Sequence, residues 1–379
     1  MAFVKIIFWL TFLLIFWTYF GYPLILRLLS YFRAPVKQPA DFTPPVSLII
    51  TAYNEEKKIA EKLQNTLTLN YPREKLEVIV VSDGSTDRTE EIVRSFEDRG
   101  IRLLSIPERH GKHYGQGRGI KEAGSEIVVL SDATTFLEPD SVRMIVRSFA
   151  DPQIGCVSGH DNIRAADEEL PGEGFYVRYE MMLRSQESAF NSLVGVSGCF
   201  FAVRKHLCSD WIDNMSSDFY MPIVTYMNGM RTILDKRAVA YYEVLVEPEK
   251  EFIRKVRTIV HGLEVLGRFK SILNPFKYGV FALQMFSHKL SRWLVPLYLV
   301  LFFWANLLLI GRNNFYLVCM ILQIAFYVMA FLGKISKHFE ESPLFRIPLF
   351  FVMVNYSILV AWHYFLIGKE FVVWEPTER

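Results

Sequence analysis

Three apolar runs in the N-terminal half of the chain each end in a cluster of polar residues that could bind a ligand. The clusters occupy residues 51–56, 82–87 and 131–135. In an open α/β sheet the carboxyl ends of neighbouring strands lie side by side, and ligands bind there. Asp-Gly and Asn also form turns and helix caps, which would explain any single cluster. Three such clusters after strands of one sheet instead indicate a shared binding site.

The side chains in these clusters suit a nucleotide sugar, which presents a flat base, a ribose and a negatively charged diphosphate. The Tyr53 ring can stack on a base, and the Asp83 carboxylate can accept hydrogen bonds from a base or ribose. The Asp132 carboxylate can hold Mg²⁺ or Mn²⁺, which neutralises the diphosphate as it leaves. No G-x-x-x-x-G-K-[ST] loop occurs, and no G-x-G-x-x-G turn opens a helix after the first strand. P-loop and dinucleotide-binding folds are therefore excluded.

Five motifs resemble those of the family-2 glycosyltransferases, an inverting group with a GT-A fold that includes cellulose, hyaluronan and chitin-oligosaccharide synthases. In chain order they are TAYNEE, VSDGSTD, GKHYGQGRG, EIVVLSDATT, and SSDF followed by RKVRT. The resemblance covers residues 46–262, and the flanking apolar segments resemble the membrane-bound branch. It implies a metal-dependent transfer of sugar, with inversion, from a uridine-linked nucleotide sugar to a saccharide or lipid-linked acceptor in polysaccharide or glycolipid synthesis.

The resemblance also implies a set of donor-binding residues. They are Tyr53, Asn54, Glu55, Asp83, Lys112, Asp132, Arg254 and Arg257. Asp132 would be the first carboxylate of the D-x-D metal motif, and Thr134 stands at the second carboxylate position. A hydroxyl is a weaker ligand for Mn²⁺ or Mg²⁺ than a carboxylate. We therefore expect weaker metal binding than in relatives with two carboxylates, or a water in that position.

Arg254 and Arg257 resemble the Q-x-x-R-W segment of the family, in which an arginine meets the diphosphate. A guanidinium group suits this task because its fork of donors matches phosphate oxygens. Contact with lipid headgroups is the alternative for this basic segment. Thr258 stands where processive synthases have a tryptophan under the acceptor sugar, which argues against synthesis of long chains.

Asp218 would be the general base, in the place of the carboxylate that closes the acidic pair of the family. A single displacement at the anomeric carbon needs one base opposite the departing diphosphate. The alternative for Asp218 is an N-cap of the following helix. The resemblance places Gly198, Cys199 and Ser217 at the acceptor subsite. Glu180 is left open between a contact with the acceptor and an ordinary surface charge.

The elements that must position these residues are short β-branched runs that alternate with polar helical segments from residue 46 to residue 242. This alternation is typical of a doubly wound α/β sheet whose strands are buried on both faces. We predict four regions: a transmembrane anchor over 1–34, a cytoplasmic GT-A catalytic domain over 46–250, amphipathic interfacial helices over 251–291, and a C-terminal transmembrane region and tail over 292–379. Residues 35–45 form a proline-rich connector.

Four apolar segments predict a multi-pass protein of the cell inner membrane or plasma membrane. The first, over 6–29, is too long for the apolar core of a signal peptide and long enough to span a bilayer. The others lie at 293–310, 315–332 and 347–367. Basic residues between the segments favour a cytoplasmic catalytic domain and both termini outside, although a last segment that does not cross would return the tail to the inner surface. These residues are Arg27, Arg33, Lys37, Lys334, Lys337 and Arg346.

The composition limits the classes of partner that the chain is expected to bind. The net charge of +2 gives no strongly basic surface, so nucleic acid is not expected as a partner. The four cysteines are scattered and form no zinc or disulfide pattern. Membrane lipids are expected partners, and a second copy of the chain or polysaccharide-export subunits are further candidates. A channel through four helices would need the interfacial helices, a second copy or another subunit, and whether the product crosses the membrane is left open.

Three alternatives remain open. The first is transfer to a polyprenyl phosphate, and the second is a catalytically inactive scaffold or subunit of a polysaccharide synthase, which the Thr134 and Thr258 departures would fit. A transporter that binds nucleotides is the third, but polar residues are sparse in the apolar segments.

Overall fold

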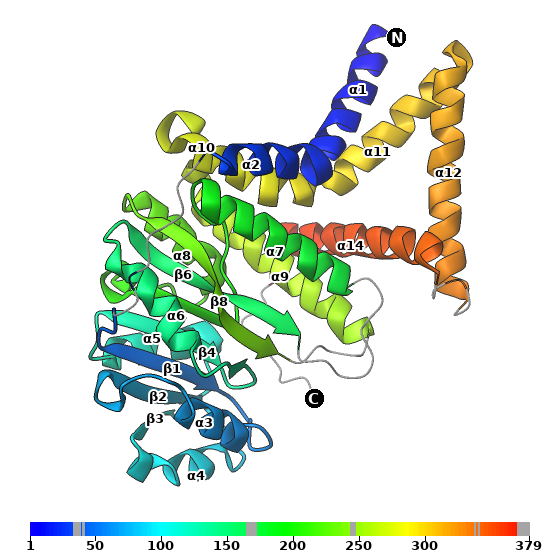
Figure 1. Ribbon diagram of the computed structural model, residues 1–379. Coiled ribbons are helices and arrows are strands. Elements are labelled where there is room, and N and C mark those ends of the chain that lie inside the picture. The colour runs from blue at the N-terminus through cyan, green and yellow to red at the C-terminus, as the bar shows by residue number, and fades with distance from the viewer. Residues whose placement is uncertain are drawn as a thin grey trace.

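The computed structural model describes residues 1–32, 39, 42–163, 173–242, 248–336, 339 and 342–369 of the 379-residue chain. An α/β domain carries a group of long helices on one side, formed by the two ends of the chain (Figure 1). Most of the proline-rich connector at 35–45, the basic residues Arg33, Lys37 and Lys337, and the C-terminal residues 370–379 lie outside the described residues.

One sheet of eight strands forms the α/β domain, in the order β3-β2-β1-β4-β7-β6-β8-β5. Strands β3, β2, β1 and β4 are parallel, and β7 runs antiparallel to both β4 and β6. The strands are β1 (Val46–Ala52), β2 (Leu76–Asp83), β3 (Ile101–Ile106), β4 (Ile127–Asp132), β5 (Phe136–Leu137), β6 (Ile154–Ile163), β7 (Phe200–Arg204) and β8 (Arg231–Tyr242). The later strands extend the sheet, as the sequence predicts.

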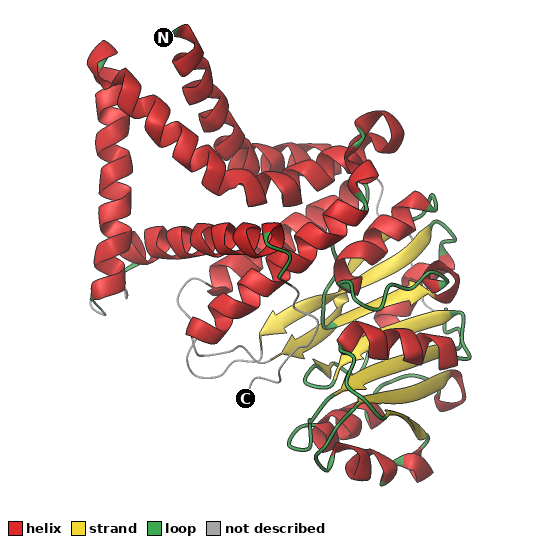
Figure 2. Ribbon diagram, turned by 180° about the vertical axis from the view of Figure 1, so that it is seen from behind, coloured by secondary structure: helices red, strands yellow, loops and turns green. Residues whose placement is uncertain are grey.

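Helices cover both faces of this sheet (Figure 2). Leu48 and Ile50 of β1 enter a core with α3 (Ile59–Leu67), α4 (Thr89–Arg94) and α6 (Ser141–Arg147). Ile49, between them, enters the opposite core with α5 (Lys112–Glu122), α7 (Glu173–Phe190) and α8 (Ser217–Met227). All three side chains are fully buried, because a strand with helices on both faces has no solvent side. The doubly wound prediction is confirmed.

Four helical segments in the described part of the chain are long and apolar enough to cross a membrane, and they match the four predicted segments. They are Ala2–Ser30, Pro275–Arg312, Asn314–Ile335 and Pro343–Leu366. The first contains α1 (Ala2–Phe16), the π-helical turn η1 (Trp17–Gly21) and α2 (Tyr22–Ser30). The second contains α10 (Pro275–Met285), the π-helical turn η7 (Phe286–Leu290) and α11 (Ser291–Leu309). The last two are α12 (Asn314–Ile335) and α14 (Pro343–Leu366).

The two π-helical turns meet and join the ends of the chain to the α/β domain. Thr18 Oγ1 lies 2.6 Å from Ser291 Oγ. From the domain side, Glu180 of α7 accepts hydrogen bonds from His288 at 2.8 Å and Arg292 at 2.7 Å. Glu187, about two turns further along the same side of α7, contacts the other nitrogen of His288 at 2.7 Å. The surface-charge alternative for Glu180 is wrong, because its carboxylate is largely buried and holds an apolar segment against α7.

The predicted amphipathic helix is α9 (Pro248–Arg268). Val265 and Leu266 on one side of α9 belong to the core of the α/β domain. Val256 and Val260 on another side pack against Ala361 of α14. Helix α14 therefore runs back from α12 and lies along α9 (Figure 1).

Candidate active site

The structure brings the three polar clusters to one edge of the sheet. Strand β1 lies between β2 and β4, and in the register of the three strands Ala52 pairs with Ser82 while Thr51 pairs with Asp132. The residues that follow the strands therefore emerge side by side. The parallel direction of the three strands causes this, since it places all their carboxyl ends at the same edge.

The segment after β1 is tied to the segment after β2. Asn54 adopts a positive φ of 50°, a backbone conformation that Asn tolerates better than most residues. Its Oδ1 accepts a hydrogen bond from the backbone N–H of Thr86 at 2.8 Å. The next backbone N–H, of Glu55, donates to Thr89 Oγ1 at 2.8 Å. Asn54 and Glu55 thus shape the rim of the site next to Tyr53.

Asp83 supports the loop that follows β3. Its carboxylate accepts hydrogen bonds from the backbone N–H groups of His110 at 3.0 Å and Gly111 at 2.6 Å. Gly84 has a φ of +69°, and a Cβ there would lie 2.6 Å from the backbone nitrogen of Arg109. A side chain at position 84 would push this loop away, so glycine is required for its close approach. Asp83 is 4% exposed and is already occupied by the loop.

This loop places Arg109 on Tyr53. The guanidinium carbon of Arg109 lies 3.8 Å from the centre of the Tyr53 ring, a cation–π geometry. Sequence reasoning missed Arg109, and no spacing or motif singles it out. Its position depends on the Asp83 hydrogen bonds, which only the folded loop reveals.

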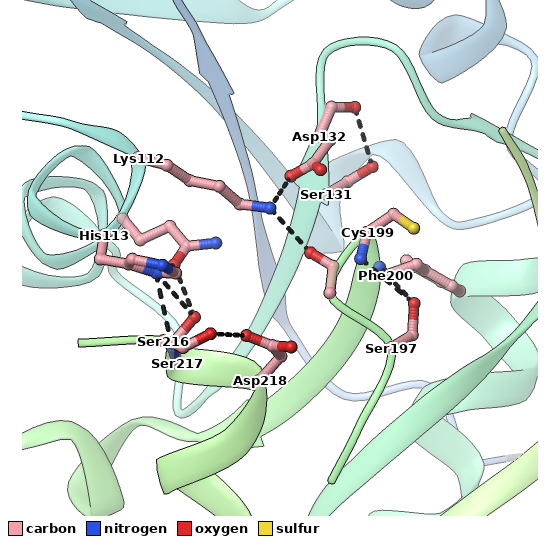
Figure 3. A network of polar contacts seen from close by, with 12 residues as sticks. Lys112, His113, Ser131, Asp132, Ser197, Cys199, Phe200, Ser216, Ser217 and Asp218 are labelled. Carbon is pink, nitrogen blue, oxygen red and sulfur yellow. Dashed lines mark hydrogen bonds and ion pairs between the residues drawn. The ribbon is translucent and has the colours of Figure 1, made fainter. Parts of the chain in front are cut away.

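Lys112, the first residue of α5, links the metal-motif segment to the acceptor segment. Its Nζ lies 2.5 Å from Asp132 Oδ1 and donates a hydrogen bond to the carbonyl of Gly198 at 2.8 Å (Figure 3). Burial alone would lower the pKa of Lys112, but the Asp132 and Asp218 carboxylates outweigh burial and raise it. The ammonium group therefore stays charged at neutral pH.

Asp218 lies on the other side of Gly198. A Cβ on Gly198 would be 3.5 Å from Asp218 Oδ2. The Gly198 backbone therefore lies between the Asp218 carboxylate and the Lys112 ammonium group, which donates to the Gly198 carbonyl. Ser216 Oγ donates to Asp218 Oδ1 at 2.6 Å. The N-cap position of α8 is Ser216, and Asp218 is the second helical residue. The N-cap alternative for Asp218 is therefore wrong.

The three predicted acceptor residues point to different places. The Gly198 carbonyl accepts from Lys112, and the backbone carbonyl of Cys199 accepts from Asp132 N–H at 3.1 Å. Burial raises the pKa of the Cys199 thiol to about 12, so it stays protonated. Ser217 is buried, and its hydroxyl donates to Gln116 Oε1 at 2.8 Å on α5. Its hydroxyl is thus committed to the contact between two helices.

Asp161 of β6 is a further carboxylate, beside Ser197 and Cys199, that sequence reasoning missed. Its Oδ1 accepts a hydrogen bond from Ser197 Oγ, and its Oδ2 lies 3.4 Å from Arg184. Burial raises the pKa of Asp161, although Arg184 and Ser197 oppose this. A charged residue at the end of the apolar run IGCVSG is the signal that could have drawn attention to it.

The predicted metal ligands are Asp132 and Thr134, in the turn after β4. Among the described residues, no three His, Cys, Asp or Glu side chains gather closely enough to hold a metal without other ligands. Mg²⁺ is often held by one or two carboxylates together with waters and substrate phosphates. One carboxylate and one hydroxyl at the carboxyl edge of the sheet fit that mode. They are too few protein ligands for a metal ion that binds before the donor.

The two predicted diphosphate-binding arginines differ in their surroundings. Arg254 pairs with Glu251 on the same helix, at 2.6 Å. No hydrogen bond or ion pair involves Arg257 in the part of the chain that the structure describes, and burial lowers its pKa to about 10. Burial and the charge of Lys112 lower the pKa of His113 to about 4. His261, one turn after Arg257 on α9, is near enough to contribute to this decrease. This face of α9 therefore approaches the start of α5.

Comparison with known proteins agrees with this geometry. Residues 47–211 match the family model described as glycosyl transferase family 2. The chain is similar to the poly-beta-1,6-N-acetyl-D-glucosamine synthase of Staphylococcus aureus, with 28% identity over 269 residues, 68% of this chain and 64% of that protein. The synthase of the same name from Staphylococcus epidermidis is 26% identical over 249 residues, 63% of this chain and 60% of that protein. The alignments thus span less than two thirds of these relatives.

A solved structure shares the fold over nearly the whole chain. It is a mannosyltransferase from Pyrobaculum calidifontis in complex with GDP-mannose and Mn²⁺. The TM-score is 0.72, with 22% identity, and the match covers 96% of this chain and 100% of that one. The GT-A-like sheet and the arrangement of apolar helices around it are therefore shared with a protein of divergent sequence.

Proposed function

We propose that this chain transfers a sugar, with inversion, from a nucleoside diphosphate sugar to an acceptor hydroxyl at the cytoplasmic face of a membrane. The match of residues 47–211 to the glycosyl transferase family 2 model supports the proposal. One observation carries the proposal. Lys112 binds both Asp132 and the Gly198 carbonyl, and Gly198 adjoins Asp218, so the donor side and the acceptor side share one centre.

On the acceptor side, Asp218 is the general base. It takes the proton from the acceptor hydroxyl while that oxygen forms a bond with the anomeric carbon, and the nucleoside diphosphate leaves from the opposite face. Ser216 Oγ orients the carboxylate through its hydrogen bond to Oδ1 and leaves Oδ2 beside Gly198 for the acceptor. Asp161, Cys199 and the Gly198 backbone border the space where the acceptor binds.

On the donor side, charged groups receive the diphosphate. The Lys112 ammonium exchanges part of its contact with Asp132 for a phosphate oxygen, and Arg257 supplies guanidinium donors from α9. Tyr53, in the loop after β1, and Arg109, in the loop after β3, bind the base of the nucleotide. A Mn²⁺ or Mg²⁺ ion held by Asp132 and Thr134 would neutralise further charge on the leaving group.

The sugar and the nucleotide are the finer part of the proposal. The curated relatives are named as synthases of an N-acetylglucosamine polymer, which favours uridine-linked N-acetylglucosamine as the first donor to test. The solved structure holds GDP-mannose, which is the second. Thr258, exposed on α9, favours transfer of one or a few sugars over long-chain synthesis.

A donor screen tests this function directly. Purified protein in lipid nanodiscs is incubated with UDP-N-acetylglucosamine, other uridine-linked sugars or GDP-mannose, with a lipid extract as acceptor, and release of nucleoside diphosphate is followed with and without Mn²⁺. We expect release from one donor class, strongly reduced by EDTA. Release from no donor would support the inactive-scaffold alternative. Labelled product that partitions into the lipid phase and releases its sugar in mild acid, as a glycosyl phosphate does, would support the polyprenyl-phosphate alternative.

The contrast between the two arginines of α9 gives a separate prediction. We expect Arg257→Ala to lower kcat/KM for the donor by about 10- to 100-fold, because a charge-assisted hydrogen bond to phosphate is lost. Arg254→Ala is the matched control, since Arg254 is already paired with Glu251, and we expect a change of less than about threefold. Steady-state kinetics with donor as the varied substrate make the comparison. Equal losses in the two variants would remove Arg257 from its role.

A further inference from the structure

A lysine lies completely buried beneath the predicted metal turn. Lys62 belongs to α3, whose buried face consists of Ile59, Lys62, Leu63 and Thr66. Its side chain is 0% exposed. Burial of an ammonium group is unfavourable unless it is well paired, so lysine is rarely found on such a face. Burial lowers the pKa of Lys62 to about 7, and the nearby Asp132 carboxylate opposes this only in part.

The Lys62 ammonium group connects the two ends of one turn. Its Nζ donates to Ser131 Oγ at 2.8 Å, immediately before Asp132, and to the carbonyl of Thr135 at 2.5 Å. The turn between these points is closed by a hydrogen bond from Thr135 N–H to the Asp132 carbonyl at 3.2 Å. Asp132 and Thr134 are therefore carried on a four-residue turn that a buried cation holds from below.

The neighbouring contacts extend the same support. Asn65, one helical turn after Lys62, exchanges two hydrogen bonds with the backbone of Leu137, at 2.8 and 2.9 Å. On the opposite side of the turn, Lys112 contacts Asp132 from the site itself. Helix α3 thus fixes the turn from behind, while α5 contacts it in front. Lys62 cannot reach a ligand, because the turn covers it.

We propose that Lys62 is a positioning residue: its buried ammonium group fixes the turn that presents Asp132 and Thr134 to the metal ion and the donor diphosphate. The proposal rests on the proposed function. It gives a physical reason for a charged side chain on the buried face of α3. The same support would offset the weaker ligand at Thr134. A metal site with one carboxylate and one hydroxyl depends more strongly on the exact placement of both oxygens.

The experiment measures binding of Mn²⁺ in the presence of UDP, and in a parallel series GDP, from the electron paramagnetic resonance signal of free Mn²⁺. Lys62→Met removes both hydrogen bonds at similar volume, and Lys62→Gln keeps an N–H donor without the charge. We expect Lys62→Met to weaken Mn²⁺ binding by about 10- to 100-fold, the usual effect of removing a group that orients metal ligands. The KM for the donor should rise with it. Lys57→Met, at an exposed position just before α3, should bind as the unsubstituted protein does.

Thermal unfolding of each variant separates positioning from a purely structural role. A lower melting temperature with unchanged Mn²⁺ affinity in the folded protein would overturn the proposal. If Lys62→Met does not fold, Lys62→Gln decides: unchanged Mn²⁺ affinity overturns the proposal, and weakened affinity with a normal melting temperature supports it. Failure of the unsubstituted protein to bind Mn²⁺ with either nucleotide would instead overturn the proposed function, on which the role of Lys62 depends.

Discussion

The Asp218→Asn protein is expected to bind the donor normally and to transfer sugar about 10²- to 10⁴-fold more slowly, the range for loss of a general base. The amide has nearly the same shape as the carboxylate and can still accept the hydrogen bond from Ser216 Oγ. It cannot take a proton from the acceptor hydroxyl. Single-turnover transfer to acceptor, measured beside equilibrium binding of the donor, shows whether only the chemical step is affected.

Asp210→Asn is a suitable control, because Asp210 is exposed and this substitution removes the same charge from the domain as Asp218→Asn does. Its transfer rate should match that of the unsubstituted protein. Near-normal transfer by Asp218→Asn would remove Asp218 from its role, and Asp161 would then be the next carboxylate to test. A loss of donor binding in Asp218→Asn would show that the substitution disturbs the Gly198 segment instead of the chemistry.

Asp132→Ala is expected to lower kcat/KM by about 10²- to 10³-fold, because electrostatic stabilisation of the departing diphosphate supplies several kcal/mol. Two effects combine in this variant. The carboxylate that would hold the metal is lost, and Lys112 loses the ion pair that raises its pKa. The residual activity should no longer respond to Mn²⁺, which a titration of the transfer rate with Mn²⁺ measures.

The opposite change at the neighbouring position sharpens this test. Thr134→Asp restores two carboxylates to the turn, and we expect Mn²⁺ to bind more tightly at unchanged nucleotide concentration. Asp98→Asn, at an exposed position in the short 3-10 helix before β3, removes one negative charge as Asp132→Ala does and is the control for that variant. Residual Mn²⁺ activation in Asp132→Ala comparable to that of the unsubstituted protein would show that the ion binds elsewhere.

The sequence predicted the elements of the site better than its contacts. Tyr53, Asp83 and Asp132 follow apolar strands, and the parallel order of β2, β1 and β4 brings their ends together as expected. The role of Asp83 could not be foreseen in the same way, because its carboxylate is occupied by the backbone of a loop that follows another strand. The motif resemblance places Ser217 at the acceptor subsite. Only the structure shows that its hydroxyl donates to Gln116 of α5.

Local patterns were therefore enough for the α/β sheet, the amphipathic helix and the four apolar segments, because hydrophobic periodicity and segment length depend on neighbouring residues alone. The tertiary structure decided which side chains meet. Lys112 contacts Gly198 across 86 residues of sequence, and Lys62 contacts Ser131 across 69. Such contacts depend on the order in which strands enter the sheet and on the direction in which each helix turns its side chains. No spacing along the chain encodes either of these, so the burial of Lys62 and the approach of Asp218 to Lys112 emerged only from the fold.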